Sequence, residues 1–158
     1  MESKRPTIED AAVTVAEKFL DRFIDWCAYQ DEPVETERTR LKLILMETFK
    51  RYGLDDGYVI ARQLEDDYMA EADEALVDLV ADVREEMQSS VDKLTNEWVK
   101  ANGLIPEFQL GKNVSAKWGL LTVNGSIAEI RADVARYGIS VPGVNGICVV
   151  PFEDVQEP

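Results

Sequence analysis

Residues 58–101 read YVIARQLEDDYMAEADEALVDLVADVREEMQSSVDKLTNEWVKA, a stretch of 44 residues without glycine or proline. Within it, large apolar side chains recur at intervals of three and four residues, which places them on one side of an α-helix. These residues are Leu76, Val80, Val83, Met87, Val91, Leu94 and Trp98. The pattern predicts either one helix of about 66 Å or two helices separated by a tight polar turn.

Two shorter helices are predicted ahead of this stretch. Thr7 and Asp10 have the spacing of a capping box, so a helix is expected to begin there. Pro33 is suited to the first turn of a second helix and Gly53 to the end of that helix. Amphipathic helices bury their apolar sides against one another, so residues 1–103 are predicted to form a helical bundle that includes a long acidic helix.

The sequence changes character after Gly103. Six of the nine glycines lie in residues 108–155, among many valines and isoleucines, which is typical of short β-strands joined by tight turns. Asn124-Gly125 is a hairpin signal in this part of the chain. Residues 104–158 are therefore predicted to form a separate small β-rich domain, which makes the whole chain an α+β fold.

The order of motifs in this second part resembles that of small SH3-like barrels of the KOW or Tudor type. The motifs are FxxGxxV from Phe108, GSIAEI from Gly125, ARYGI from Ala135 and VVPFEDV from Val149. The resemblance implies a barrel over the last third of the chain, whereas the N-terminal helices carry no motif of a known family. A second interpretation stays open, because Ser126 and Glu129 also have capping-box spacing and would begin a short helix in a strand–helix–strand unit.

The composition excludes several classes of activity. The chain has 31 acidic and 17 basic residues, a net charge of -14 and no histidine. Without histidine there is no Ser/His or Cys/His nucleophile and no His-ligated metal. Cys27 and Cys148 lie in apolar stretches without CxxC spacing, which predicts reduced core residues. No catalytic residue, metal site or cofactor is predicted, and the protein is not expected to be an enzyme.

The acidic excess is concentrated in residues 53–102, which contain 14 acidic and four basic residues. On an unbroken helix, six of these carboxylates would lie opposite the apolar stripe. They are Asp67, Glu71, Glu74, Asp78, Asp82 and Glu85. The ten carboxylates between positions 65 and 86 would give about one charge per 3 Å of helix, close to the roughly 3.4 Å per phosphate of a DNA strand. The face is a candidate for binding a basic protein by nucleic-acid mimicry, and a merely solvated helix surface is the alternative interpretation.

Aromatic residues of the β-rich part form a second candidate surface. Trp118 and Tyr137, together with Phe108 and Phe152, could line a groove for a peptide or for bases. A barrel of this size also needs aromatic side chains in its own core, which is the competing interpretation of the same residues.

These features predict a non-enzymatic acidic protein that binds a basic surface of nucleic-acid-handling machinery. In its size and acidity the chain is similar to phage- and plasmid-encoded inhibitors of host defence, the anti-CRISPR and anti-restriction proteins, which would act in a bacterial host cytoplasm. Two alternatives stay open, namely a structural or assembly subunit of a larger complex, and an SH3-like regulator that touches RNA, polymerase or the ribosome.

The expected partner is a protein, because the net charge of -14 disfavours direct contact with nucleic acid or an anionic membrane. No apolar run approaches the roughly 20 residues of a membrane span, so a cytoplasmic location is expected. The apolar stripe of the long helix also offers a surface for homodimerisation.

Overall fold

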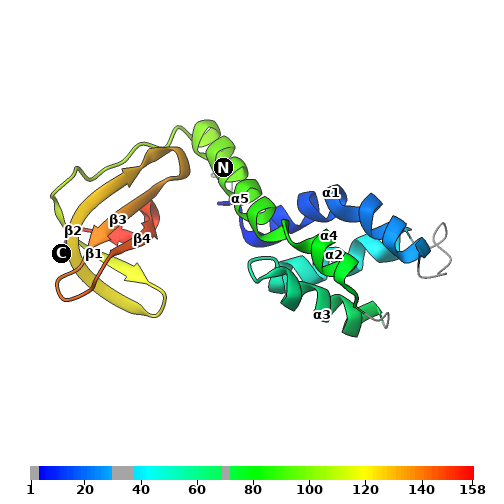
Figure 1. Ribbon diagram of the computed structural model, residues 1–158. Coiled ribbons are helices and arrows are strands. Elements are labelled where there is room, and N and C mark those ends of the chain that lie inside the picture. Colours follow the sequence, from blue (N-terminus) through cyan, green and yellow to red (C-terminus); the bar gives the residue numbers. More distant parts are fainter. Residues whose placement is uncertain (1–3, 30–37, 69–71) are drawn as a thin grey trace. The chain divides into compact units, whose positions relative to one another are not determined.

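The computed structural model describes residues 4–29, 38–68 and 72–158 (Figure 1). The chain divides into two compact units. The first, Pro6–Leu94, is called the helical unit below. The second, called the sheet unit, joins residues 4–5 to Thr95–Pro158. The chain is therefore a mixed α+β protein, as predicted. The boundary between its compact units follows Leu94, whereas the sequence analysis placed the division between residues 103 and 104.

The helices occupy the first two thirds of the chain. They are α1 (Ile8–Tyr29), α2 (Arg38–Tyr52), α3 (Gly57–Tyr68), α4 (Glu74–Val80) and α5 (Val83–Asn102). In the helical unit, α1 packs on α2, α2 on α3, and α3 on α4. The stretch predicted to be one long helix or two is thus divided among α3, α4 and α5, so a continuous acidic helix is not present.

Local capping signals place the start of α1 as predicted. The carboxylate of Asp10 accepts hydrogen bonds from the backbone N–H of Thr7 at 2.8 Å and from its hydroxyl at 2.9 Å. These bonds satisfy a donor at the helix N-terminus that has no partner inside the helix. α2 ends at Tyr52, immediately before Gly53, also as predicted. The predicted helix start at Pro33 lies outside the described residues.

The core of the helical unit contains the apolar stripe of the opening stretch. Leu76, Val80, Val83 and Met87 are completely buried together with aromatic residues of α1 and α2. The ring of Phe19 meets the edge of Phe49 with 5.9 Å between the ring centres. The apolar side chains predicted to need a partner surface therefore find it within the same chain.

The break between α3 and α4 is stabilised by Asp73. This residue is the N-cap of α4, and its Oδ1 accepts hydrogen bonds from the backbone N–H of Leu76 at 2.8 Å and from the indole N–H of Trp26 at 3.0 Å. Trp26 is buried on α1 and stacks on Phe23. The hydrogen bond from Leu76, followed by that from Trp26, holds the pKa of Asp73 below its usual value. α4 has only seven residues, so this cap fixes a helix too short to form alone.

The sheet unit contains five strands in one antiparallel sheet. They are β1 (Asn113–Trp118), β2 (Leu121–Arg131), β3 (Arg136–Ser140), β4 (Ile147–Pro151) and β5 (Val155–Gln156). The spatial order is β4-β3-β2-β1-β5, with short 3₁₀ turns η1 (Ala132–Val134) after β2 and η2 (Phe152–Asp154) before β5. The sheet is open, so closure into a barrel is not shown. Residues 121–131 are extended, so the alternative prediction of a short helix from Ser126 is wrong.

The first hairpin turns five residues earlier than predicted. Trp118 pairs with Leu121 across a two-residue turn, and Gly119 supplies the positive φ of +62° that such a turn requires. Asn124 and Gly125 instead lie within β2. A Cβ atom at Gly125 would stand 2.3 Å from the carbonyl oxygen of Ser140, so glycine is needed there for close approach of β3 rather than for a turn.

The core of the sheet unit is centred on Tyr137, which is 1% exposed. Its ring centre lies 4.3 Å from that of Phe152, and its hydroxyl accepts a hydrogen bond from the backbone N–H of Phe108 at 2.9 Å. Cys27 and Cys148 are both buried, as predicted, and neither forms a disulfide bond within the described residues. Among the helices of the described residues, none is long and apolar enough to cross a membrane.

Replacement of Asp73 is expected to destabilise the helical unit in a pH-dependent way. Asp73→Ala removes the cap of α4 and leaves the Trp26 indole without this acceptor, which should lower the free energy of unfolding by about 0.5–2 kcal/mol near neutral pH. Asp73→Asn keeps a capping oxygen and removes only the charge. The folded-state pKa is lowered, so the contribution of the charge is present above the unfolded value of 3.8 and disappears as the pH falls through the folded pKa.

Urea denaturation at several pH values measures this dependence, with the exposed Asp25→Asn on α1 as the control. The difference between wild type and Asp73→Asn should shrink in acid, whereas Asp25→Asn should stay close to wild type throughout. A difference that does not change with pH would contradict the assignment.

Gly125→Ala is expected to lower the free energy of unfolding of the sheet unit by about 1–3 kcal/mol, because the added methyl group meets the backbone of β3. The neighbouring exposed Asn124→Ala serves as the matched control in the same denaturation experiment and should change stability far less. Equal stability of the two variants would refute the close contact.

Candidate functional site

The predicted acidic residues do not share one helix face. Asp67 lies near the end of α3, Glu74 and Asp78 on α4, Asp82 in the turn before α5, and Glu85 in the first turn of α5. All five side chains are exposed. Glu71 lies outside the described residues. The carboxylates are therefore spread over consecutive short helices, and we call these five residues the acidic surface.

The packing of α3 against α4 adds two carboxylates that the sequence analysis did not assign to the surface. A Cβ at Gly57 would stand 3.0 Å from the Cα of Ala81, so the start of α3 and the end of α4 are in close contact. Asp56 precedes Gly57 and Asp82 follows Ala81. Exposed Asp55 and Asp56 therefore lie beside the acidic surface. Asp56 also caps α3, because its Oδ1 accepts a hydrogen bond from the backbone N–H of Val59 at 3.0 Å.

Most of the acidic surface is not neutralised by the protein's own cations. Within residues 4–29, 38–68 and 72–158, Glu74, Asp78, Asp82 and Glu85 form no ion pair. Asp67 accepts a hydrogen bond from the Gln63 amide at 3.2 Å, which leaves its charge in place.

Neighbouring carboxylates behave differently from those of the acidic surface. Glu86 pairs with Lys18 at 2.5 Å, and Glu65 pairs with Arg62. The exposed acidic side chains of α4 and its following turn therefore differ from the acids beside them in having no basic partner among the described residues.

The two compact units differ sharply in charge. The helical unit, Pro6–Leu94, contains 23 acidic and ten basic residues in the sequence, a net charge of -13. The rest of the chain, residues 1–5 and 95–158, contains eight acidic and seven basic residues in the sequence, a net charge of -1. The acidity of the protein is thus a property of one unit.

The sheet unit contains a cavity of about 540 Å³ whose wall combines aromatic and aliphatic side chains with polar and charged ones. The lining side chains are those of Lys4, Arg5, Trp98, Asn102, Leu104, Ile105, Glu107, Phe108, Tyr137, Phe152, Glu153 and Val155. We call it the aromatic cavity. Its size falls within the range of small-molecule sites.

The structure does not bring together the two aromatic residues predicted to bind a partner. Tyr137 forms part of the core and of the cavity wall, with Phe108 and Phe152 beside it. Trp118 is at the end of β1, exposed, and does not line the cavity. Trp98 contributes to the wall instead, although the sequence pattern assigned it to the apolar stripe of a helix.

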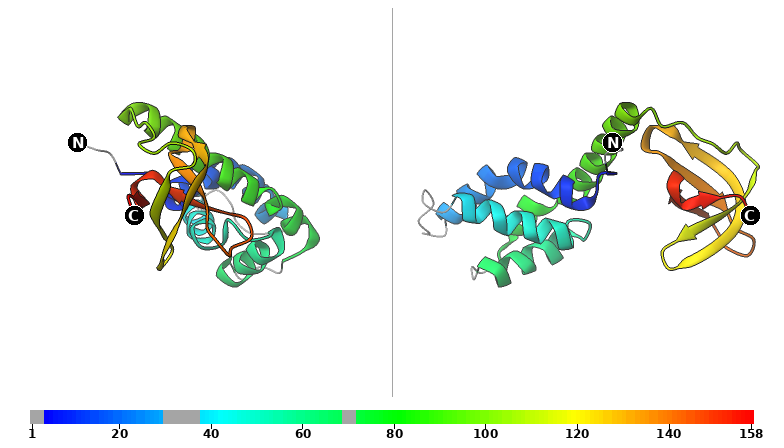
Figure 2. Two further views of the ribbon diagram at one scale, coloured as in Figure 1. Left: turned by 90° about the vertical axis from the view of Figure 1, so that its left-hand side faces the viewer. Right: turned by 180° about the vertical axis from the view of Figure 1, so that it is seen from behind.

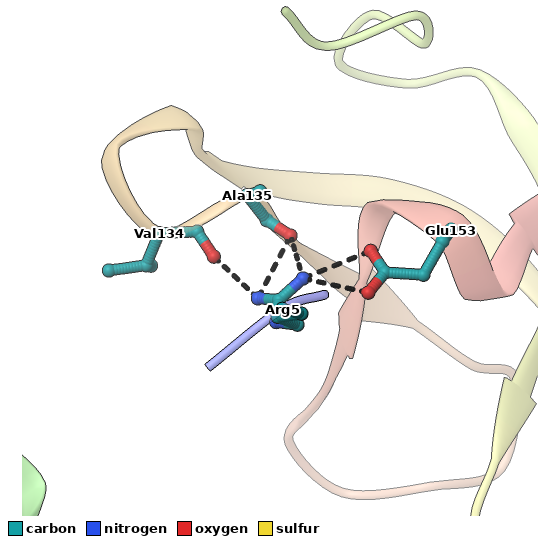
Figure 3. Close-up of polar contacts among 4 residues, drawn as sticks. All are labelled: Arg5, Val134, Ala135 and Glu153. Carbon is teal, nitrogen blue, oxygen red and sulfur yellow. Dashed lines mark hydrogen bonds and ion pairs between the residues drawn. The ribbon is translucent and has the colours of Figure 1, made fainter. Parts of the chain in front are cut away.

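Arg5, which lines the cavity, binds two segments that are distant from it in sequence (Figure 3). Its guanidinium pairs with both carboxylate oxygens of Glu153, at 2.9 and 3.1 Å. It also donates to the carbonyl oxygens of Val134 at 2.6 Å and Ala135 at 3.3 Å. The same group lies 5.5 Å from the centre of the Trp98 ring, a cation–π distance.

The bonds of Arg5 secure an unusual backbone turn. Ala135 has a φ of +48°, a left-handed conformation that costs energy for a residue with a Cβ. Its carbonyl oxygen accepts hydrogen bonds from the Arg5 guanidinium and from the backbone N–H of Phe152, the latter at 3.0 Å. Nothing near Arg5 in the sequence indicated this role, because its partners lie about 130 to 148 residues away.

The two candidate surfaces differ in the side chains that they present. The described residues contain no group of three or more His, Cys, Asp or Glu side chains placed to hold a metal ion. Arg5 is engaged by Glu153 and by two carbonyl groups, so its charge serves the fold. The acidic surface presents uncompensated charge, and the aromatic cavity presents apolar area.

Arg5→Ala is expected to lower the free energy of unfolding of the sheet unit by about 1–3 kcal/mol, because it leaves Glu153 and two carbonyl groups without this donor. Arg5→Lys should recover little of the loss, since one ammonium nitrogen cannot replace both Nη1 at Glu153 and Nη2 at the Val134 carbonyl. Thermal denaturation compares both with Lys4→Ala, a neighbouring exposed cation. If Arg5→Ala were as stable as Lys4→Ala, Arg5 would not anchor these two segments.

The structure thus offers two candidate surfaces. The acidic surface lies on the helical unit and the aromatic cavity in the sheet unit. Comparison with known family models, curated proteins and solved structures found no match to the chain.

Proposed function

We propose that the chain is a non-enzymatic binding protein whose acidic surface occupies a basic, nucleic-acid-binding surface of another protein. The observation that carries the proposal is the set of exposed carboxylates on α4 and the following turn that have no ion-pair partner among the described residues. Cationic clefts that bind phosphates attract such a surface, because the potential of the two is complementary.

The cost of this arrangement supports a role beyond solubility. Glu74 and Asp78 are four residues apart on α4, as are Asp78 and Asp82, and like charges at that spacing destabilise a helix by about 0.2–0.5 kcal/mol per pair. A net charge of magnitude about 2–8 already keeps a small domain soluble. The helical unit alone reaches -13. A bound basic partner would remove the repulsion.

The contrast with Glu86 and Glu65 strengthens this interpretation. Those two carboxylates have cationic partners in the same unit, so the chain does supply lysine and arginine where acids support the fold. Exposed acids that merely solvate a helix are commonly interspersed with cations at similar spacing. The uncompensated carboxylates are instead consecutive along the chain, on α4, the following turn and the start of α5.

We also propose that the sheet unit belongs to the small SH3-like barrels. The supporting observations are the strand order, in which β5 lies next to β1, and the 3₁₀ turn η2 between β4 and β5. In this proposal the sheet unit is a module of low net charge that accompanies the acidic recognition surface.

Neutralising the acidic surface tests the proposed function. One variant combines Glu74→Gln, Asp78→Asn and Asp82→Asn, and the matched control combines Asp25→Asn, Glu97→Gln and Asp133→Asn, three exposed acids outside the acidic surface and the aromatic cavity. Both lose three negative charges, so net charge is the same. Wild type, variant and control are immobilised, and proteins retained from a bacterial lysate are eluted first with short duplex DNA and then with salt.

The proposal predicts a protein that wild type and control retain, that duplex DNA elutes, and that the surface variant binds roughly tenfold more weakly, equal to about 1.4 kcal/mol. Binding should weaken steeply with salt, because exposed charges are screened over about 8–10 Å. The melting temperature of the variant should stay near that of wild type. The proposal would be contradicted if variant and control retained the protein equally. It would also be contradicted if duplex DNA did not elute the retained protein.

A further inference from the structure

The sheet unit contains three asparagines that are each followed by a glycine. They are Asn102, Asn124 and Asn145. An asparagine carries the amide carbon of its side chain, Cγ, close to the backbone nitrogen of the next residue, and a glycine there has no Cβ to obstruct their approach. A bond between these two atoms closes a succinimide ring and expels ammonia. The reaction requires a backbone that can turn, so the fold decides which of the three pairs reacts.

Asn124 and Gly125 are held within strand β2. Asn124 pairs with Ser115 of β1, and Gly125 pairs with Val114 in the same ladder. On the side of β3, a Cβ atom at Gly125 would stand only 2.3 Å from the carbonyl oxygen of Ser140. Ring closure at this pair would require the backbone to leave the ladder, and such local opening costs free energy.

Asn102 and Gly103 are held at the end of α5. The side-chain amide nitrogen of Asn102, which is the group that would leave, donates a hydrogen bond to the carbonyl oxygen of Trp98 at 2.8 Å. The backbone N–H of Gly103, whose nitrogen would attack, donates a hydrogen bond to the carbonyl oxygen of Lys100 at 3.3 Å. Both reacting groups of this pair therefore have partners in the folded chain.

Asn145 and Gly146 lie in the loop between β3 and β4, residues 141–146, which Figures 1 and 2 show in orange. Both residues are exposed. Within the described part of the chain, neither the Asn145 side chain nor the Gly146 N–H takes part in a hydrogen bond. A Cβ atom at Gly146, where φ is +106°, would have no heavy atom within 4 Å beyond its chain neighbours. The reacting groups of this pair are thus unengaged among the described residues and have room to turn.

We propose that Asn145 is a site of spontaneous deamidation, with water as the only co-reactant. The backbone nitrogen of Gly146 gives its proton to hydroxide and bonds to Cγ of Asn145. The bond between Cγ and Nδ2 breaks, and the amide group takes a proton from water and leaves as ammonia. Water then adds to one of the two ring carbonyl groups and breaks the bond of that group to the ring nitrogen, which yields aspartate or isoaspartate at position 145. Overall one water is consumed and one ammonia is released, and no oxidant or reductant takes part.

The product changes both the charge and the backbone of this loop. Either form adds a carboxylate between Val144 and Ile147, which are exposed apolar residues. Isoaspartate also lengthens the main chain by a methylene group, because the chain then continues through the former side-chain carbonyl. The change falls next to the pair of Ser140 and Ile147, which ends the ladder between β3 and the edge strand β4. An aged sample is therefore a mixture of charge forms that differ at one edge of the sheet.

Trypsin separates the three pairs, because cleavage after lysine and arginine places each on its own peptide. The peptides are 101–112 with Asn102, 118–131 with Asn124 and 137–158 with Asn145. The full-length protein is incubated at mildly alkaline pH, folded in one arm and unfolded in urea in the other, and samples are digested at mildly acidic pH. Mass spectrometry measures the conversion of amide to carboxyl in each peptide, and a protein isoaspartate methyltransferase detects isoaspartate.

In the folded protein, Asn145 should convert roughly tenfold faster than Asn124 or more, because a tenfold ratio needs only about 1.4 kcal/mol of local opening of the ladder. In urea the two rates should become similar, since valine precedes and glycine follows both residues. Equal rates in the folded protein would overturn the proposal. A preference for Asn145 that persists unchanged in urea would also overturn it, because the preference would then come from the local sequence.

Asn145→Gln gives a second readout on the intact chain. Glutamine has to close a larger ring, so its amide is lost far more slowly. Ion-exchange chromatography should resolve a more acidic form that accumulates in wild type and in the matched control Asn124→Gln, but not in Asn145→Gln. An acidic form that accumulates equally in all three proteins would refute the assignment. The site lies outside the acidic surface, so this proposal and the proposed function can fail separately.

Discussion

Repulsion among carboxylates is the constraint under which the helical unit folds. Its apolar core has to outweigh a net charge of -13 that most domains of this size do not carry. The buried contacts of Phe19, Phe49 and the apolar stripe meet that requirement. Some acids are also used structurally, since Asp10, Asp56 and Asp73 each accept hydrogen bonds at the start of a helix. Recognition is inferred from the exposed acids of α4 and the following turn, which have no such structural use.

Local signals predicted much of the fold, and the failures have non-local causes. The capping box of Thr7 and the α+β division follow from short-range chemistry and composition. The break of the long helix depends on Asp73, whose second partner, Trp26, is on another helix 47 residues away. The misplaced hairpin has a similar origin, because Gly125 is required by the approach of Ser140 and not by a turn.

The candidate site was predictable to the same degree. Counting charges identified the acidic residues, but their arrangement assumed an unbroken helix. Asp55 and Asp56 join them only because Gly57 allows α3 to approach Ala81. The wall of the aromatic cavity was partly anticipated through Tyr137, whereas Arg5 was missed because its partners are distant in sequence.

The anchoring of Arg5 has a consequence for synthesis of the chain. The sheet unit is discontinuous, since Arg5 leaves the ribosome well before Glu153, which follows it by 148 residues. The whole helical unit is, in topological terms, an insertion between these two pieces, and it can fold while the Arg5 contact is still unmade. Closure over 148 residues is among the most non-local steps available to a chain of this length. A peptide fused before Arg5 would therefore affect the assembly of the sheet unit, which is the last part of the protein to be completed.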